Sequence, residues 1–390
     1  MKNTIKLLAI IAFAAVIGFS FTACGDGSGG GGGGGGDDDN GGGAVDSNWK
    51  WTAITRPDIS ISAIAYGNGR WVAVGGQGKI AYSTDNGVTW TAANSTFGTS
   101  STIYGIAYNN GWFVAGGQGG RGIAYSTDGA SWTAIANNLS LGGGFIPQDI
   151  AYGNGRFVAM GTDGGKFAYS ADNGATWKAV SDRTPWQIGE VMGLARYASA
   201  NAIAYGNGKF VAVGRYGKIV YSADNGESWT AVSNSTFGSD SSQSEIFDIA
   251  YGNGKFVAVG YSGKIAYSSD GASWTAGTPP TTTVTLNGKT YTNVGLDSRV
   301  IAYGSGNAGG RFVIGGRTGK LAYSADGINW TVVADNTFVG TYIDAMAYGN
   351  GRFIVKSTNA GGKMVYADWG EPDSGGIIII GPKPPIAGGN

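Results

Sequence analysis

Short runs in which apolar residues alternate with small or polar ones, separated by glycine-rich turns, fill most of this chain. In one unit, Ser62 to Tyr66 is the first run, Gly67-Asn68-Gly69 a tight turn, and Arg70 to Val74 the second run. A period of two predicts β-strands, and Asn-Gly favours a hairpin because a type I′ turn needs positive φ at both central residues. Lys79 to Ser83 and Thr89 to Ala92 extend the pattern, so the unit is expected to be a four-stranded antiparallel meander.

The unit recurs seven times, each copy marked by a tyrosine in Ile-Ala-Tyr-Gly or a close variant, 42 to 53 residues after the previous one. A period of this size filled with short strands indicates a propeller or similar array. One twisted sheet cannot bury both of its faces, so neighbouring units must stack and close radially. The chain is therefore predicted to be an all-β, seven-bladed propeller. The marker residues are Tyr66, Tyr108, Tyr152, Tyr205, Tyr251, Tyr303 and Tyr348.

The ends of the repeat region indicate how the ring closes. The seventh unit stops at Trp369 without the outermost strand that the other six possess. A matching piece, Trp49 to Ala53, precedes the first unit. We therefore expect the N-terminal strand to complete the last blade. The stretch from Thr283 to Thr292 is expected to be an inserted hairpin around Asn287-Gly288.

Six units carry Ser-x-Asp-x-Gly-x-x-Trp after the third strand, or a version one residue shorter. The element resembles the Asp-box of BNR-repeat propellers, which implies a structural turn at the periphery of the ring, away from binding sites. An aspartate there can accept backbone N–H groups while the tryptophan packs across the hairpin. A calcium loop is not expected, because the carboxylates are too few. The aspartates are Asp85, Asp128, Asp172, Asp224, Asp270 and Asp326.

The N-terminus has the features of an export signal. Lys2 and Lys6 precede an almost unbroken apolar run from Leu7 to Phe21, and small residues then lead to Cys24. Phe21-Thr22-Ala23-Cys24 resembles a bacterial lipobox, with Phe21 in the place of the more usual Leu. The resemblance implies cleavage before Cys24 and a lipid on its sulfur. Cys24 is the only cysteine, so no intramolecular disulfide can form. An ordinary signal peptide, or an uncleaved membrane helix, is the alternative.

Composition divides the chain into four parts. We predict a signal peptide over 1–23, a flexible glycine-rich tether over 24–44, the propeller over 45–373 and a tail over 374–390. The formal net charge is zero, with 26 basic and 26 acidic residues, which argues against a nucleic-acid surface. No cofactor or metal site is predicted.

The Asp-box resemblance also raises sialidases and other glycosidases, but the residues do not favour them. The Phe/Tyr-Arg-Ile-Pro hallmark of sialidases is absent, and the chain has four glutamates and no histidine. Without histidine, Ser-His-Asp and Cys-His systems are excluded. The arginines and lysines that begin the second strands recur from blade to blade, which indicates scaffold. We therefore expect no catalysis; a carboxylate-only hydrolase using Glu190 or Glu245 is the competing hypothesis.

Residues that break the repeat are the candidates for binding. They lie in loops between the second and third strands and between blades, which an antiparallel blade places opposite the Asp-box turns. Aromatic residues and arginines gathered on one face are typical of recognition surfaces; drift in solvated loops is the alternative. The candidate ligand-binding residues are Arg121, Trp186, Arg215, Tyr216, Tyr261 and Arg317.

These observations together predict an exported, monomeric lipoprotein, anchored to a bacterial membrane through Cys24 on the periplasmic or cell-surface side. Its propeller is expected to be a non-catalytic binding or assembly scaffold for a glycan or an envelope protein. A group of photosynthetic assembly factors with a similar propeller shows that the fold supports this role. The alternatives are a carbohydrate-active hydrolase and a purely structural surface repeat protein.

Overall fold

A computed structural model describes 51–119, 122–135, 145–161, 165–192, 194–239, 242–286, 289–306, 309–333, 338, 341–358 and 363–369. The chain divides at residue 42, and every described residue belongs to the second unit, 43–390. The predicted signal peptide, Cys24, the tether and the C-terminal tail lie outside the described residues. Within the described ranges, no helix has both the length and the apolar character that a membrane crossing needs.

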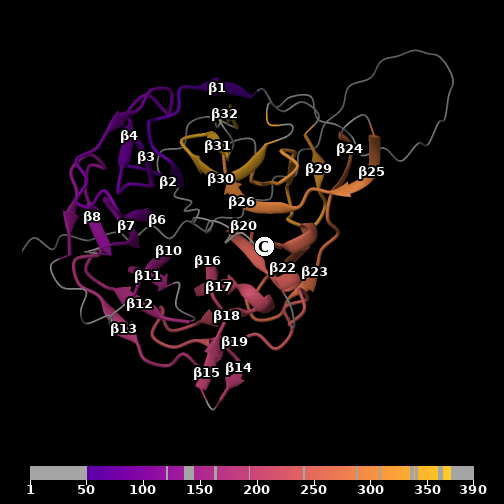
Figure 1. Cartoon of the computed structure of the whole chain (residues 1–390), viewed down its shortest axis with the longest axis horizontal. Helices are drawn as coiled ribbons and strands as arrows, with labels where there is room; N and C mark the ends of the chain where they lie inside the picture. The colour runs from indigo at the N-terminus through magenta and orange to yellow at the C-terminus, as the bar shows by residue number, and fades with distance from the viewer. Residues whose placement is uncertain are drawn as a thin grey trace, which may run out of the picture. The chain divides into compact units, whose positions relative to one another are not determined.

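Seven four-stranded antiparallel sheets form a ring, as predicted from the repeat (Figure 1). The first strand of each repeat lies nearest the centre of the ring, and the later strands follow outward. The molecule is a seven-bladed β-propeller. Blade 1 holds β2 (Ile61–Gly67), β3 (Arg70–Gly75), β4 (Ile80–Ser83) and β5 (Thr91–Ala92); blade 2 holds β6 (Thr102–Asn109), β7 (Trp112–Gln118), β8 (Ile123–Ser126) and β9 (Thr133–Ala134); blade 3 holds β10 (Pro147–Gly153), β11 (Arg156–Gly161), β12 (Phe167–Ser170) and β13 (Lys178–Val180).

The remaining blades repeat this order. Blade 4 holds β16 (Ala200–Gly206), β17 (Lys209–Gly214), β18 (Ile219–Ser222) and β19 (Thr230–Ala231); blade 5 holds β20 (Ile246–Gly252), β21 (Lys255–Gly260), β22 (Ile265–Ser268) and β23 (Thr275–Ala276); blade 6 holds β26 (Ser298–Gly304), β27 (Arg311–Gly316), β28 (Leu321–Ser324) and β29 (Thr331–Val332); blade 7 holds β30 (Tyr342–Gly349), β31 (Arg352–Thr358), β32 (Met364–Asp368) and β1 (Thr52–Ile54).

The N-terminal strand closes the ring, which confirms the prediction made from the incomplete seventh repeat. β1 pairs antiparallel with β32, in a register that sets Thr52 opposite Tyr366 and Ile54 opposite Met364. Both ends of the propeller therefore belong to one blade. Without β1, the seventh blade would have three strands and the outer edge of β32 would be unpaired; β1 covers that edge.

Two hairpins are inserted between blades. The first comprises β14 (Gln187–Val191) and β15 (Leu194–Tyr197), and the second β24 (Thr281–Leu286) and β25 (Lys289–Gly295), as expected around Asn287-Gly288. Short 3-10 helices complete the connections: η2 (Thr184–Trp186), η3 (Arg215–Gly217), η4 (Ser242–Ser244) and η5 (Tyr261–Gly263).

The apolar core lies between the blades rather than in a single centre. Each buried cluster combines residues from neighbouring sheets; for example, Val72 and Val74 of blade 1 pack with Ile106 and Phe113 of blade 2. Burial between sheets removes both faces of every blade from water, which a single meander could not do.

The repeated Tyr-Gly pair has a packing role on this inter-blade surface. A Cβ atom built on Gly206 would overlap the ring of Tyr251 in the next blade. The same relation joins Gly67 to Tyr108 and Gly153 to Tyr205. Only glycine leaves room for the neighbouring aromatic ring, so the pair is repeated because adjacent blades need it.

The Ser-x-Asp turns are built from local hydrogen bonds. In blade 1, the Ser83 hydroxyl donates to Asp85 Oδ1 at 2.7 Å, the Thr89 backbone N–H donates to the same carboxylate at 2.8 Å, and Trp90 Nε1 donates to the Gly87 carbonyl at 3.0 Å. Burial opposes ionisation of Asp85, but the hydrogen bonds from Thr89 and Ser83 outweigh it and lower the pKa to about 2.

These turns also hold neighbouring blades together. Asn207 Nδ2, in the turn between β16 and β17, donates to the Ser269 carbonyl of blade 5 at 3.1 Å, and Lys209 Nζ donates to the Asp270 carbonyl at 2.8 Å. Arg156 of blade 3 pairs with Glu227 of blade 4 at 2.6 Å. The cationic side chain at this repeated position therefore connects its blade to the next one. We call this end of the ring the turn face, and the opposite end, which carries the other connections, the loop face.

Candidate ligand-binding site

Every inner strand carries a one-residue β-bulge at its loop-face end. In each blade the pairing with the second strand skips the residue that lies four positions before the repeat tyrosine. Bulges re-aim side chains and often lie beside functional sites. The residues on either side also vary, but the bulged position is the most diverse, with seven different residues: Ser62, Tyr104, Gln148, Asn201, Phe247, Arg299 and Asp344. We call this set the bulge ring.

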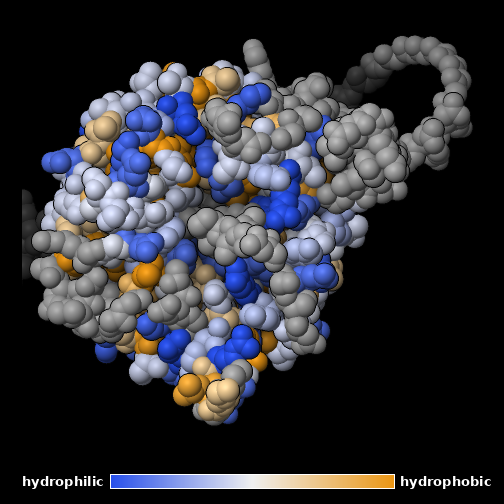
Figure 2. Space-filling view, in the orientation of Figure 1, coloured by the Kyte–Doolittle hydropathy of each residue, from blue (hydrophilic) through white to orange (hydrophobic). Residues whose placement is uncertain are grey.

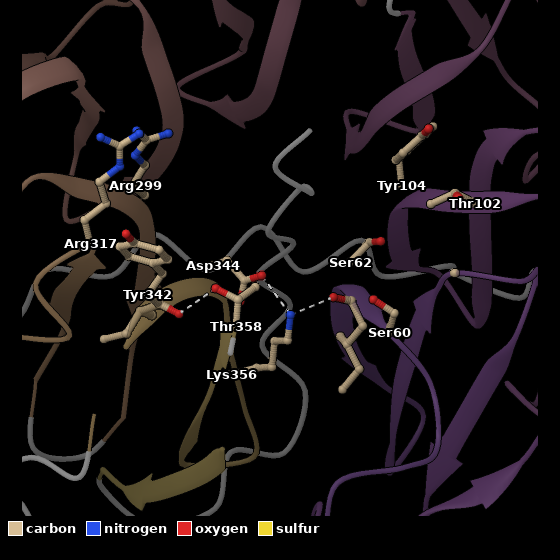
Figure 3. A pocket seen from close by; sticks show the side chains of 13 residues that line it. Ser60, Ser62, Thr102, Tyr104, Arg299, Arg317, Tyr342, Asp344, Lys356 and Thr358 are labelled. Carbon is tan, nitrogen blue, oxygen red and sulfur yellow. Dashed lines mark hydrogen bonds and ion pairs between the residues drawn. The ribbon is translucent and has the colours of Figure 1, made fainter. Parts of the chain in front are cut away.

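Four members of the bulge ring, from blades 6, 7, 1 and 2, line a cavity of about 430 Å³ on the loop face (Figure 3). Figure 3 shows Arg299 and Arg317 beside each other on one side and Tyr104 with Thr102 on the other. Hydroxyl groups and cations dominate the polar lining. The cavity residues are Ser60, Ile61, Ser62, Gly76, Thr102, Tyr104, Arg299, Arg317, Tyr342, Ile343, Asp344, Lys356 and Thr358.

A buried ion pair forms the floor between blades 7 and 1. Lys356 Nζ lies 2.7 Å from Asp344 Oδ2 and also donates to the Ile61 carbonyl at 3.2 Å. The other blades carry Val, Met or Gly at the position of Lys356. A buried lysine is costly unless it is paired and hydrogen-bonded, and both conditions are met here.

Arg299, like Lys356, is a buried cation of the cavity. Its side chain is 4% exposed, and its guanidinium lies 3.9 Å from the ring centroid of Phe247. Its Nε has no hydrogen-bond partner among the described residues. Burial lowers the pKa of Arg299, and the nearby Arg317 adds to this, while Asp297 and Glu245 oppose it. A guanidinium still carries its charge under these conditions, so this wall of the cavity holds a buried cation with one unsatisfied donor.

The rest of the bulge ring is closed. Asn201 Nδ2 donates to the Ile246 carbonyl at 2.7 Å and to Glu245 Oε1 at 3.1 Å, and Glu245 in turn pairs with Arg215 at 3.3 Å. Gln148, Asn201 and Phe247 are buried. The open part of the ring is therefore off-centre, over blades 6, 7, 1 and 2.

The structure brings only one of the predicted binding residues into the cavity. Arg317 lines it and pairs with Asp297 at 3.5 Å. Arg215 and Tyr216 lie in η3 and Tyr261 in η5, in the loop-face connections of blades 4 and 5, and none of the three lines the cavity. Tyr261 is close enough to Arg299 to affect its charge equilibrium.

Two predicted residues have other outcomes. Trp186 is 1% exposed and packs in the core with Phe167, because the inserted segment folds back over blade 3 before the first hairpin begins. It therefore anchors that insertion in the core. Arg121 lies outside the described residues.

The glutamates of the hydrolase hypothesis occupy different elements. Glu190 lies on β14, in the hairpin at the periphery of the ring, whereas Glu245 precedes β20 on the loop face. Among the residues that line the cavity, Asp344 is the one carboxylate, and it is paired with Lys356.

Sequence reasoning did not single out two buried aspartates that follow bulged residues. Asp149 accepts the backbone N–H of Ile150 at 2.8 Å and that of Ile203, in blade 4, at 3.0 Å. Asp248 makes the same pair of bonds to Ile249 and to Ile301 of blade 6. Burial raises the pKa of Asp149 well above its usual value. Both carboxylates therefore connect neighbouring blades. Within the described residues, no cluster of three or more side chains that could bind a metal ion occurs.

Comparison with solved structures agrees with the fold. "YCF48 bound to D1 peptide" shares 16% identity, covers 84% of this chain and 99% of its own, with a TM-score of 0.59. YCF48 from Cyanidioschyzon merolae shares 15% identity over 82% of this chain and 98% of its own, with a TM-score of 0.57. The WD40 β-propeller domain of Doa1 shares 12% identity over 82% and 97%, with a TM-score of 0.55. At these identities the likeness concerns the propeller fold alone. No protein-family profile and no curated protein matches the chain.

Proposed function

We propose that this chain is an envelope lipoprotein whose propeller is a non-catalytic binding or assembly platform, with the loop-face cavity as its ligand site. The export signal and Cys24 support the anchor, and the tether up to residue 44 gives the propeller freedom to meet its partner.

The diversity of the bulge ring carries the proposal. The bulged position of the inner strand carries a different residue in each of the seven blades, and four of these residues line the loop-face cavity. In the four blades that border the cavity, the bulged residue is polar or charged, whereas the next residue of the strand is small or apolar: Ala63, Gly105, Val300 and Ala345. A different polar residue from each of four blades at one opening suits recognition of an asymmetric ligand.

We infer that the ligand is a segment of a polypeptide. The cavity volume lies within the ~300–1,000 Å³ range of small-ligand pockets, enough for a few residues. Its lining offers Arg299 and Arg317 to acceptor groups, hydroxyls to backbone amides, and Tyr104 and Tyr342 to apolar side chains. A structurally similar propeller, YCF48, has been solved bound to a peptide.

The test is binding of the purified chain to arrays of envelope-protein peptides and, in parallel, of glycan and peptidoglycan fragments. Variants Arg299→Gln and Tyr104→Ala remove one cavity donor and one aromatic wall, and each is expected to weaken peptide binding at least ~10-fold, on the scale of a lost central contact. Thr275→Ala, exposed on β23 of blade 5, is the matched control.

The outcomes separate the hypotheses. Peptide binding that Arg299→Gln reduces and Thr275→Ala does not supports the platform. Binding of glycans alone, with the same response to the variants, would replace the peptide by a sugar in the same site. Binding by the variants equal to that of the original protein would remove the cavity from the proposal.

The hydrolase alternative has its own measurement. We expect the original protein to release no reducing sugar or reporter above background from a panel of glycosides, and the variants Glu190→Gln and Glu245→Gln to give the same result. A rate that either substitution abolishes would establish a hydrolase, since carboxylates carry glycoside hydrolysis.

A further inference from the structure

The tip of the first inserted hairpin carries the two most exposed large apolar side chains among the described residues. Met192 is 98% exposed and Leu194 is 73% exposed. Val191 pairs with Leu194, so a two-residue turn beginning at Met192 joins β14 to β15. In Figure 1 the hairpin projects outward beyond β19, and Figure 2 shows an apolar surface at its end.

Met192 occupies a backbone conformation that disfavours it. Its φ is +52°, in the left-handed region. The corresponding two-residue turns of the blades use asparagine there, at Asn68, Asn154, Asn207 and Asn253, with φ between +44° and +50°. Asparagine tolerates this region, whereas a longer apolar side chain does not gain there. Because Met192 is exposed, no packing within the chain compensates.

The base of the hairpin is firmly held. Trp186 is buried against Phe167, at a centroid distance of 6.0 Å, and the Ala198 backbone N–H donates to the Trp186 carbonyl at 3.0 Å. The Arg183 guanidinium lies 4.1 Å from the ring centroid of Tyr197. These contacts fix the base of the hairpin, and its tip projects away from the blade.

We propose that this tip, Met192 with Leu194, inserts into the interfacial region of the lipid bilayer to which the chain is anchored. Two side chains offer far less area than the ~800 Å² per partner of a stable protein interface. The hairpin carries one exposed cation, Arg196 on β15, and one exposed carboxylate, Glu190 on β14, so the proposed contact rests on the two apolar side chains and not on net charge.

The tether makes this weak contact effective. Twenty-six residues lie between Cys24 and Trp51, which reach up to ~90 Å when extended. A propeller of this size is roughly 50 Å across. The tip can therefore reach the membrane from the rim opposite β1 (Figure 1), and tethering raises the local lipid concentration. The inference rests on the lipid anchor of the proposed function.

The experiment uses the lipidated full chain in vesicles of phosphatidylethanolamine and phosphatidylglycerol, with a nitroxide at Ala195→Cys, beside the tip. Flotation first shows whether the chain is on the vesicles. Electron paramagnetic resonance then measures access of oxygen and of a water-soluble nickel complex. The label is expected to be shielded from nickel and open to oxygen, whereas a label at Thr275→Cys on β23 stays open to nickel.

The variant Met192→Asn/Leu194→Thr gives the second arm. Asparagine suits the turn, so the variant should unfold at the same or a higher urea concentration and still float, yet its Ala195→Cys label should become accessible to nickel. Two results would overturn the tip proposal alone. In one, the chain floats but the Ala195→Cys label of the unaltered hairpin is accessible to nickel; in the other, the label stays shielded from nickel in the Met192→Asn/Leu194→Thr variant. Failure to float overturns the anchor and, with it, the tip contact.

Discussion

At the residue scale, Gly206 gives a direct test of the inter-blade packing. Gly206→Ala would set a methyl group into the ring of Tyr251, and a well-packed interior responds with a loss of about 1–3 kcal/mol in the free energy of unfolding. Gly98→Ala is the matched control, because a Cβ there meets only the Ser101 hydroxyl at an ordinary 3.6 Å. Urea denaturation measures both. An equal, small effect of the two substitutions would contradict the packing role of the Tyr-Gly pair.

Residues at repeated positions could be interpreted from the sequence, and those of the cavity mostly could not. Lys356 was visible as a lysine among Val, Met and Gly, but only ring closure brings it to Ile61 of blade 1. The bulge that aims Arg299 at the cavity is a one-residue slip of register, which the sequence pattern does not reveal. Trp186 was expected at a ligand and lies in the core, because an unpaired aromatic in an insertion can equally well anchor that insertion.

At the element scale, the Ser-x-Asp turns predict how the fold responds to acid. The backbone N–H of Ser273 lowers the pKa of Asp270 to about 2, and burial opposes it. The folded pKa is below the value of the unfolded chain, so this contribution to stability is present above pH ~4 and is lost as the pH falls towards 2. Asp270→Asn should reduce by up to one the number of protons taken up on unfolding near pH 3. Urea denaturation at several pH values measures this number.

The exposed carboxylate of Asp58, which lies outside these turns, provides the control for that experiment. Asp58→Asn removes one exposed charge without removing a turn, so it measures the effect of net charge alone on unfolding. The same change in slope for both substitutions would assign the effect to net charge instead of the turn hydrogen bonds.

Elements whose pattern repeats were the most predictable part of the fold. The blades could be predicted because the same strand period and the same turn residues recur in seven repeats, so each repeat supports the assignment of the others. The insertions have no such support. The sequence predicted the second hairpin from Asn287-Gly288, whereas Met192 replaces the expected asparagine in the first, and that hairpin was not foreseen.

At the scale of the whole molecule, the ring is closed by three residues of β1, and this joint is expected to control unfolding. Ala53 lies opposite Val365 in the pairing of β1 with β32, and such antiparallel partners have Cα separations of about 4.5–5.5 Å, suited to a disulfide. Ala53→Cys/Val365→Cys is expected to cross-link, and closing so long a loop should stabilise the fold by several kcal/mol, as the ~4.7 kcal/mol of a 100-residue loop indicates.

The control is a cross-link within one blade, Tyr82→Cys/Thr91→Cys, whose partners are also opposite each other in the sheet. Its loop is short, so it should add less stability and leave the terminal joint free to open. Unfolding rates in urea, with and without reductant, compare the two. If the β1 cross-link slows unfolding no more than the blade cross-link does, the ring does not open first at its joint. A marked slowing would mean that the ring opens first at the β1 joint in blade 7, one of the four blades that line the loop-face cavity.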